Sequence, residues 1–425
     1  MPRSRAVRTK EMHITQAEEI ARPEDGGGRL SGGKLKVAVL GATGMVGQQL
    51  TRLLTNHPWF EVVIVAASAN SAGTSYTEAV RGRWAMETRI PDEIAAMKVW
   101  DVQAVDEIVS QVDIAFCAIN LDKVGVLRLE HAYAAAGAWV TSNNSAYRPD
   151  PFVPMVIPAV NPHHLDLIPR QRQAKGYRTG ALIVKSNCSI QSYVIALEPL
   201  REFGIESVSV HSEQAISGAG KTFETFPDIE RNLIPLINGE EQKSEVEPLK
   251  IWGKVEVDGI VPASGPKIKA KCVRVSVLHG HTAYVTVKFR VTPTVAQILE
   301  RWENFGSPDQ AGSPVGQRGV PGRASRLGYH SRWGAGLPSA PRKLIHYRPE
   351  PDRPQPRLDV MTENGMAVNI GQLKVDNDQL VSFTGLSHNL ILGAAGGAVL
   401  ATEAAVARQL VYRRISTRQE APLPA

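Results

Sequence analysis

A buried strand that runs directly into a glycine-rich turn and then a helix most restricts how this chain can fold. Val37 to Leu40 form a continuous apolar run, and "GATGMVG" (41–47) follows it. Apolar residues then recur at helical spacing as far as Pro58, at Met45, Val46, Leu50, Leu53 and Leu54. Such a run is typical of a strand buried on both faces of a parallel sheet. The unit predicts an α/β fold that begins near residue 35.

Further segments extend this alternation of strands and helices. Strands are expected at 61–68, 112–119 and 138–145, with a helix from Asp122 to about Ala136. This order predicts a doubly wound parallel sheet. Beyond residue 188 the chain is rich in β-formers interrupted by glycine, which favours a second, α+β domain with a mixed or antiparallel sheet.

The length of 425 residues suggests two domains of ordinary size. The first would be a nucleotide-binding domain completed by a C-terminal helix at about 387–412, and the second would include an exposed loop insertion rich in Gly, Pro, Ser and Arg. The expected divisions are a disordered leader 1–34, a first domain 35–187, a second domain 188–386 with the insertion 307–336, and a tail 413–425.

Composition excludes several classes of protein. No apolar stretch is long enough to span a membrane, and residues 1–34 lack the hydrophobic segment of a secretory signal. Three cysteines do not make a disulfide framework, so a cytoplasmic location is expected. The net charge of +6 comes from residues 1–34, 307–336 and 411–425, which leaves the remainder near neutral, and no nucleic-acid partner is expected.

The glycine-rich turn indicates a cofactor. Between a strand and a helix, the spacing G-x-x-G-x-x-G of Gly41, Gly44 and Gly47 is typical of a Rossmann-type dinucleotide site, in which backbone N–H groups and the helix N-terminus face a pyrophosphate. The alternative is a tight turn without a ligand. The next strand ends without a carboxylate, in a segment that contains Ser68, Asn70 and Ser71, so NADP is expected rather than NAD.

A cysteine at a strand–helix junction is a candidate nucleophile. In "ALIVKSNCSIQSYVIALEPL" (181–200), Cys188 follows a run of β-formers and precedes an apolar-periodic segment. In the first turn of a helix, the dipole and free N–H groups would lower the pKa of its thiol. The alternative is a small buried apolar residue, which is the expectation for Cys117 and Cys272. The polar neighbours of Cys188 leave both interpretations open.

A nucleophilic thiol needs a partner for proton transfer, and "RVSVLHGHTAYV" (274–285) contains two candidates. Arg274, His279 and His281 lie close together there, and Gly280 could kink the strand. The residues alone favour surface histidines at a strand end.

Together these segments resemble the aspartate-semialdehyde dehydrogenase family, in its archaeal and fungal branch. The resemblance runs from about Lys36 to Arg408 and excludes 307–336. Its segments occur in the same order as in the family and include "GATGMVG", "SNNSAYRPDPFVPMVIPAVNPHHL", "SNCS", "EQAISGAGK", "FPDIERNLIPLINGEEQK", "CVRVSVLHGHT", "LPSAPRKLIHY", "DRPQPRLD" and "LSHNLILGAAGGAVL".

The resemblance implies roles for individual residues. Cys188 matches the nucleophile, Gln214 the glutamine that positions a thioester, and His281 an acid/base histidine, which is expected to titrate near its ordinary pKa. The residues implied for substrate binding are Arg274 for an α-carboxylate, Glu240 for an amino group, and Lys243 and Arg148 for a phosphate.

Cofactor contacts are implied in the same way. They are Gly41, Ala42, Thr43, Gly44, Met45, Val46, Gly47, Ser68, Ser71, Ser217, Gly218, Asn389 and Gly393. Thr74 stands where the family commonly has a basic residue beside the 2′-phosphate. No metal site is expected.

The activity implied is the NADP-dependent reductive dephosphorylation of L-aspartyl 4-phosphate to L-aspartate 4-semialdehyde through a cysteine thioester, in lysine, threonine and methionine biosynthesis. The partners implied are this substrate, phosphate and a second copy of the chain, as a homodimer or a dimer of dimers, with a second domain that serves catalysis and dimerisation. Two alternatives are an acyl-CoA reductase of the malonyl-CoA type and a non-enzymatic NADP-binding sensor. A sensor would not need Cys188, Gln214 and His281 together.

Overall fold

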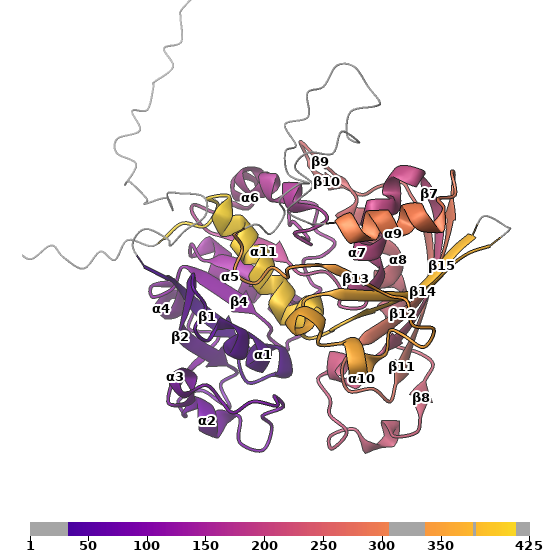
Figure 1. The fold of residues 1–425 in the computed structure, drawn as a ribbon. Coiled ribbons are helices and arrows are strands. Elements are labelled where there is room, and N and C mark those ends of the chain that lie inside the picture. The colour runs from indigo at the N-terminus through magenta and orange to yellow at the C-terminus, as the bar shows by residue number, and fades with distance from the viewer. Residues whose placement is uncertain (1–32, 306–335, 377–379, 414–425) are drawn as a thin grey trace, which may run out of the picture.

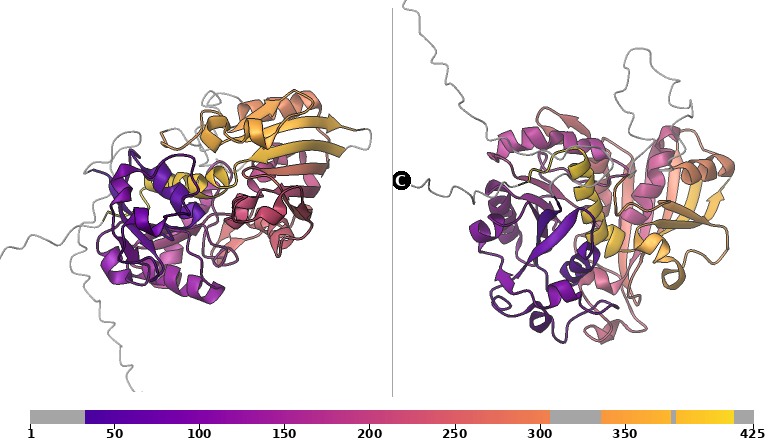
Figure 2. Two further views of the ribbon diagram at one scale, coloured as in Figure 1. Left: turned by 90° about the horizontal axis from the view of Figure 1, so that it is seen from below. Right: turned by 60° about the vertical axis from the view of Figure 1, so that its left-hand side comes forward.

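The computed structural model describes residues 33–305, 336–376 and 380–413 (Figure 1). Most of the expected leader (1–34), the expected insertion (307–336) and nearly all of the tail (413–425) therefore lie outside the described residues. Two sheets organise the remainder, one on each side of a long C-terminal helix (Figures 1 and 2). None of the helices that the structure describes is both long and apolar enough to cross a membrane.

The first sheet is parallel, with the strand order β3-β2-β1-β4-β5-β6. Its strands are β1 (Leu35–Leu40), β2 (Phe60–Ala67), β3 (Val99–Asp101), β4 (Ile114–Cys117), β5 (Trp139–Ser142) and β6 (Ala181–Val184). The expected doubly wound sheet is confirmed. The strands expected at 112–119 and 138–145 are shorter, because the chain bends away where polar residues such as Asn143 follow β5.

Helices cover both faces of this sheet. They are α1 (Met45–Leu54), α2 (Tyr76–Ala79), α3 (Asp92–Ala95), α4 (Val105–Val109), α5 (Lys123–Ala135), the 3₁₀ helix η1 (Pro162–Leu167) and α6 (Ile168–Lys175). Side chains of β1 alternate between the faces: Val37 and Val39 pack with α1, and Ala38 and Leu40 pack with α5. Burial on both faces explains why the sequence of β1 is a continuous apolar run.

The second sheet is mixed, with the order β13-β14-β15-β12-β7-β11-β8. Its strands are β7 (Ile205–Gln214), β8 (Leu233–Ile234), β11 (Lys267–Val275), β12 (His281–Phe289), β13 (Ile345–Arg348), β14 (Val368–Val375) and β15 (Leu380–Ser387). A small hairpin, β9 (Lys254–Glu256) and β10 (Gly259–Val261), stands apart. The expected α+β domain with a mixed sheet is confirmed.

Helices of the second domain pack on one face of its sheet. They are α7 (Gln191–Leu197), α8 (Glu240–Ile251), α9 (Val295–Asn304) and α10 (Pro356–Asp359), with the 3₁₀ helices η2 (Glu198–Phe203), η3 (Ile216–Ala219), η4 (Pro227–Ile229) and η7 (Thr362–Gly365). Because α7 packs on β12, β14 and β15 and α8 packs on β11, residues of β7 alternate between buried and exposed. The opposite face carries exposed polar side chains, among them Ser209, His211 and Lys271.

The C-terminal helix returns the chain to the first sheet. A π-helical turn η8 (Ile391–Ala395) leads into α11 (Gly396–Ala407), which lies between the two sheets in every view (Figures 1 and 2). The helix is shorter than the expected 387–412 because β15 extends to Ser387. It is held by a 2.7 Å hydrogen bond between Thr402 and Thr141 and a 2.8 Å contact between Glu403 and His57.

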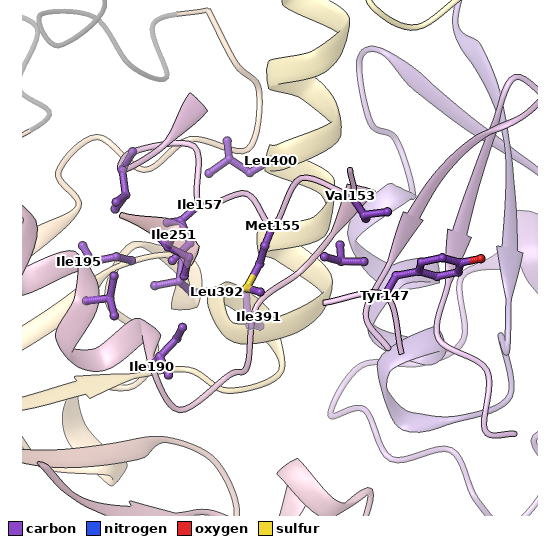
Figure 3. Packing of buried hydrophobic residues seen from close by; sticks show 14 of the residues in the cluster. Tyr147, Val153, Met155, Ile157, Ile190, Ile195, Ile251, Ile391, Leu392 and Leu400 are labelled. Carbon is purple, nitrogen blue, oxygen red and sulfur yellow. The ribbon is translucent and has the colours of Figure 1, made fainter. Parts of the chain in front are cut away.

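One apolar cluster joins the two domains. Figure 3 shows Met155 and Ile157 of the first domain close to Ile391 and Leu392 at the start of the C-terminal helix, with Ile190 beside them. All of these side chains are buried. The segment between β6 and α7 passes through this cluster, so the residues of "KSNCS" lie at the junction of the domains.

Candidate active site

Cys188 lies in the short connection between β6 and α7, and its Sγ atom is 3.2 Å from Nε2 of His281. His281 is the first residue of β12, 93 positions away in the sequence. The prediction that Cys188 occupies the first turn of a helix is wrong, because α7 begins only at Gln191. The prediction that the histidine lies on the surface is also wrong, since His281 is fully buried.

The thiol of Cys188 is protonated in the resting site. Burial raises its pKa to about 11, and the carboxylate of Glu240 acts in the same direction, against the opposing charges of Arg148 and Arg274. The expected fall of this pKa is therefore wrong. A helix dipole acts only within the first turn, whereas burial at the domain junction disfavours the thiolate more strongly.

His281 is neutral and its orientation is set by the backbone. Burial, together with the charge of Arg274, lowers its pKa to about 3, so the expectation of an ordinary pKa is wrong. The N–H of Ala215 donates to Nδ1 at 3.0 Å. The proton of the neutral ring therefore resides on Nε2 and points to Sγ of Cys188. The imidazole is placed to donate to the sulfur.

Gln214 and Arg274 lie side by side next to this pair. They are paired residues of the parallel strands β7 and β11. Nη1 of Arg274 donates to the carbonyl of Ala215 at 2.8 Å. Gly218 packs so closely that a Cβ there would lie 3.0 Å from Cε1 of His281 and 3.3 Å from Nη1 of Arg274. A side chain at Gly218 would therefore crowd both of these functional groups.

Glu240 and Lys243 begin α8 and face the same region. Oε1 of Glu240 accepts from Nζ of Lys243 at 2.7 Å, and Oε2 accepts from Asn187 at 2.8 Å and from Gln214 at 3.4 Å. Burial alone would raise the pKa of Glu240, but the Lys243 ammonium and the hydrogen bonds outweigh it and hold the pKa below its usual value. Glu240 is therefore an ionised carboxylate beside the thiol.

Arg148 is linked to the cysteine segment through Glu247, a residue that the sequence did not suggest. Nη1 of Arg148 donates to Oε1 of Glu247 at 2.9 Å, and Oε2 accepts from the backbone N–H of Asn187 at 2.6 Å. Glu247 lies two helical turns after Glu240 on α8, so both residues are on the same face of the helix. This spacing is the signal in the sequence that could have indicated Glu247.

Asn143 is a second residue that the sequence analysis did not assign. Its backbone carbonyl accepts from Nη2 of Arg148 at 3.1 Å. Within the described residues, both polar side-chain atoms of Asn143 and Nε of Arg148 are buried without a hydrogen-bond partner. Buried polar groups normally find partners, so these atoms would be satisfied by a water molecule or by a polar ligand.

The glycine-rich turn fits a dinucleotide pyrophosphate. Gly41 has a φ of +81°, and a Cβ there would lie 2.3 Å from the carbonyl oxygen of Ala118. A Cβ at Gly47 would lie 2.1 Å from the carbonyl oxygen of Gly41. The N-cap of α1 is Gly44, which makes no side-chain cap, and no acidic residue lies in the first turn. The free N–H groups of this helix can therefore face an anion.

The other predicted cofactor residues form two groups. Ser68 directly follows β2 and Ser71 lies in the next turn of the chain, and the N–H of Gly41 joins the glycine-rich turn to the end of β2. Asn389 donates to Oγ of Ser217 at 2.8 Å and accepts from the backbone N–H of Gly280 at 2.9 Å. A Cβ at Gly393 would lie 2.8 Å from Cβ of Cys188. Because η8 packs on α1, the group near the end of β2 and the group near the thiol of Cys188 lie along one continuous surface of packed elements.

No set of three or more His, Cys, Asp or Glu side chains suited to a metal ion occurs among the described residues. The three cysteines of the chain are all free, and Cys117 and Cys272 are buried, as expected for structural cysteines.

A nucleotide-binding fold with a cysteine–histidine pair at the domain junction places the chain in the class of nucleotide-dependent dehydrogenases. Comparison with known families agrees. Residues 36–168 match the family described as "Semialdehyde dehydrogenase, NAD binding domain", and residues 197–392 match "Semialdehyde dehydrogenase, dimerisation domain".

Individual relatives identify the family more narrowly than the two domain models do. The chain is 38% identical over 382 residues to an aspartate-semialdehyde dehydrogenase of Aspergillus fumigatus (88% of this chain, 97% of the relative). It is 37% identical over 380 residues to that of Archaeoglobus fulgidus (89% and 100%). The structure matches the Candida albicans enzyme crystallised with NADP, with a TM-score of 0.73 and 34% identity over 89% of this chain and 100% of that one. The chain belongs to the aspartate-semialdehyde dehydrogenase family.

The protonated state of the thiol predicts a steep dependence of alkylation on pH. Only the thiolate reacts with iodoacetamide, and below a pKa of about 11 the thiolate fraction grows about tenfold for each pH unit. The rate at which Cys188 is labelled, measured by mass spectrometry, should increase steadily from pH 7 to pH 9. Cys188→Ala serves as the control for background labelling. A rate that levels off near pH 7 would contradict the raised pKa.

Lys185 is a buried amine without a carboxylate partner among the described residues. It is 2% exposed, and Nζ lies 3.4 Å from Oγ of Ser186. Burial, with Arg148 in the same direction, lowers its pKa to about 7, against the opposing effect of Cys188 and Glu247. The side chain packs against α11, where a Cβ at Gly397 would lie 2.3 Å from its Cε.

Replacement of this lysine should stabilise the protein. Between pH 7 and about 10.4 the unfolded chain binds more protons at Lys185 than the folded chain does, so folding stability rises with pH in this window. Lys185→Met removes the desolvation cost and should raise the thermal midpoint more at pH 7 than at pH 10. The exposed Lys123→Met serves as the control and should shift neither midpoint. An equal rise of the thermal midpoint at both pH values, or a fall of the midpoint at pH 7, would contradict the lowered pKa of Lys185.

Proposed function

We propose that the chain is a cytoplasmic enzyme that reduces L-aspartyl 4-phosphate to L-aspartate 4-semialdehyde with NADPH, a step in lysine, threonine and methionine biosynthesis. The 3.2 Å contact between Sγ of Cys188 and Nε2 of His281 carries this proposal, because a thiol and an imidazole in contact can form and release a thioester. Gln214, Arg274 and Glu240 surround the pair and suit an amino-acid substrate.

Charges of both signs would hold the substrate. Arg274 uses one N–H group for the carbonyl of Ala215, and its other donors can clamp the α-carboxylate. The ionised Glu240 would accept from the amino group. Lys243 and Arg148 would bind the phosphate, each already oriented by a carboxylate. The unpaired amide of Asn143 beside Arg148 adds a donor for a phosphate oxygen.

In the first half-reaction Cys188 would attack the acyl carbon of the substrate. A C–S bond forms, the C–O bond to phosphate breaks, and the thiol proton leaves with the phosphate as hydrogen phosphate. The amide of Gln214 would stabilise the oxyanion, an interaction worth about 3 kcal/mol for a single donor in comparable sites. Arg148 and Lys243 would stabilise the departing phosphate.

The second half-reaction releases the aldehyde and restores the thiol. NADPH, when bound, supplies the hydride that reduces the thioester carbon. Breaking the C–S bond then leaves a thiolate, which needs one proton. Nε2–H of His281 points at this sulfur and would stabilise the thiolate by a hydrogen bond, and the proton that restores the thiol would come from the solvent. His281 would thus act toward Cys188 as a neutral hydrogen-bond donor, because its pKa of about 3 leaves the ring uncharged and the N–H of Ala215 occupies Nδ1.

The glycine-rich turn between β1 and α1 would hold the pyrophosphate of the cofactor, with Thr43, Met45 and Val46 contributing backbone N–H groups. The N–H of Ala42 donates to the carbonyl of Ala66 at 3.0 Å and fixes the turn to β2. Ser68 and Ser71 would contact the adenosine half, and Ser217, Gly218, Asn389 and Gly393 the nicotinamide half. The packing of η8 on α1 supports this placement of the two halves of the cofactor, because it brings the glycine-rich turn and the thiol of Cys188 to the same region.

An acyl-CoA reductase would use the same thiol chemistry. Malonyl-CoA carries a carboxylate that Arg274 could bind but no amino group, so the ionised Glu240 favours the amino-acid substrate.

The reverse reaction tests the proposal directly. Protein supplied with aspartate semialdehyde, NADP and inorganic phosphate should produce NADPH, measured by its absorbance, and should produce none without phosphate. Cys188→Ala should abolish the reaction, and His281→Gln should lower kcat by about 10²- to 10⁴-fold. The buried Cys117→Ala is the matched control and should keep activity. Reduction of acyl-CoA thioesters in place of this reaction would favour the alternative.

We also propose that the chain forms a homodimer through the open face of its mixed sheet. The family model for residues 197–392 is described as a dimerisation domain. The side chains on this face are exposed on neighbouring strands, namely Ser209, His211, Tyr284, Lys269 and Lys271. A second copy of the chain could pair with this face across a two-fold axis. A dimer of dimers would need a further surface.

Sedimentation equilibrium tests this arrangement. The wild type should have twice the monomer mass of 46.2 kDa at micromolar concentration. Tyr284→Arg places charge in the proposed interface and should shift the protein toward the monomer. Val257→Arg, in the exposed turn between β9 and β10, is the matched control and should stay dimeric. A monomeric wild type would exclude the dimer, and a dimeric Tyr284→Arg variant would exclude this face as its interface.

A further inference from the structure

An arginine in the loop after α2 reaches the end of β2. Nη2 of Arg83 donates to Oγ of Ser71 at 3.2 Å, and its Nε donates to the carbonyl of Ala79 at 2.8 Å. Ser71 is buried and lies in the turn that follows the end of β2, where the adenosine ribose of a dinucleotide binds in this class of fold. Arg83 itself is exposed, so solvent and ligands can reach its guanidinium.

The backbone of this loop is attached to the glycine-rich turn through one side chain. Nε2 of Gln48, which is 1% exposed on α1, donates to the carbonyl of Thr43 at 3.0 Å and to the carbonyl of Arg83 at 2.9 Å. Oε1 of Gln48 accepts from the N–H of Ala85 at 2.8 Å. Arg83 is therefore positioned relative to the turn that holds the pyrophosphate.

The charge of Arg83 is not neutralised locally. No carboxylate among the described residues lies within 4 Å of its guanidinium, and its Nη1 has no hydrogen-bond partner among them. Its neighbour Arg81, by contrast, lies 3.7 Å from Glu78. The residues that follow β2 supply only neutral groups. Among them, the hydroxyl of Thr74 donates to the carbonyl of Ser71 at 2.9 Å.

We propose that Arg83 binds the 2′-phosphate of NADP and sets the preference for NADP over NAD. The proposal rests on the cofactor in the proposed function and identifies the residue that selects it. A dianionic phosphate beside Ser71 would gain a charge-assisted hydrogen bond from a cation already oriented toward it. The 2′-hydroxyl of NAD carries no charge and gains little from the same guanidinium. Arg83 is thus a specificity residue that takes no part in the reaction itself.

Cofactor binding without substrate tests this assignment. NADPH and NADH would be titrated into wild type, Arg83→Gln and Arg81→Gln, with the fluorescence of the reduced nicotinamide as the readout. Arg83→Gln should raise the dissociation constant for NADPH about ten- to one-hundred-fold and leave that for NADH unchanged. Arg83→Lys should retain part of the affinity for NADPH. Arg81→Gln, two residues away and also exposed, should resemble the wild type.

The outcomes of this titration separate the role of Arg83 from the proposed reaction. Unchanged NADPH affinity in Arg83→Gln excludes the contact, and equal weakening of both cofactors shows a structural role for the loop. An identical effect of Arg81→Gln shows general electrostatics. A wild type that binds NADPH tightly but does not oxidise aspartate semialdehyde contradicts the proposed reaction and leaves this assignment standing. A wild type that binds neither cofactor overturns both.

Discussion

Close backbone packing where the C-terminal segment re-enters the first domain is the constraint on which the site depends. A Cβ at Gly393 would lie 2.8 Å from Cβ of Cys188, and a Cβ at Gly397 would lie 2.3 Å from Cε of Lys185. Only glycine permits these approaches. They allow η8 and α11 to pack between the sheets, and this packing brings the thiol, the glycine-rich turn and the mixed sheet together.

The same packing decides the electrostatics of the site. Because the thiol, His281 and Lys185 are withdrawn from water, each is shifted toward its neutral form. The charges that persist are paired, as in Glu240 with Lys243 and Arg148 with Glu247. In the resting site a neutral thiol and imidazole thus face a set of oriented ions. The charges of the proposed substrate would complement those ions.

The fold and many site residues could be predicted because their signals are local. The apolar run of β1, the glycine spacing after it and the segment "SNCS" each lie within a few residues of sequence. The errors arose where distant segments meet. His281 looked like a surface residue because the alternation of β12 does not reveal what covers its end. The pKa of Cys188 does not follow from local sequence, because the thiol is packed against Gly393 of η8, some two hundred residues later.

By itself, the sequence determined the class of fold and the positions of the glycine-rich turn and of the candidate nucleophile, since strand burial, glycine turns and short motifs are encoded by neighbouring residues. Only the tertiary structure decided which ring atom of His281 carries the proton, that Glu247 orients Arg148, and that Arg83 reaches Ser71. These features depend on hydrogen bonds and burial between segments far apart in the chain, and periodicity and spacing carry no information about such contacts.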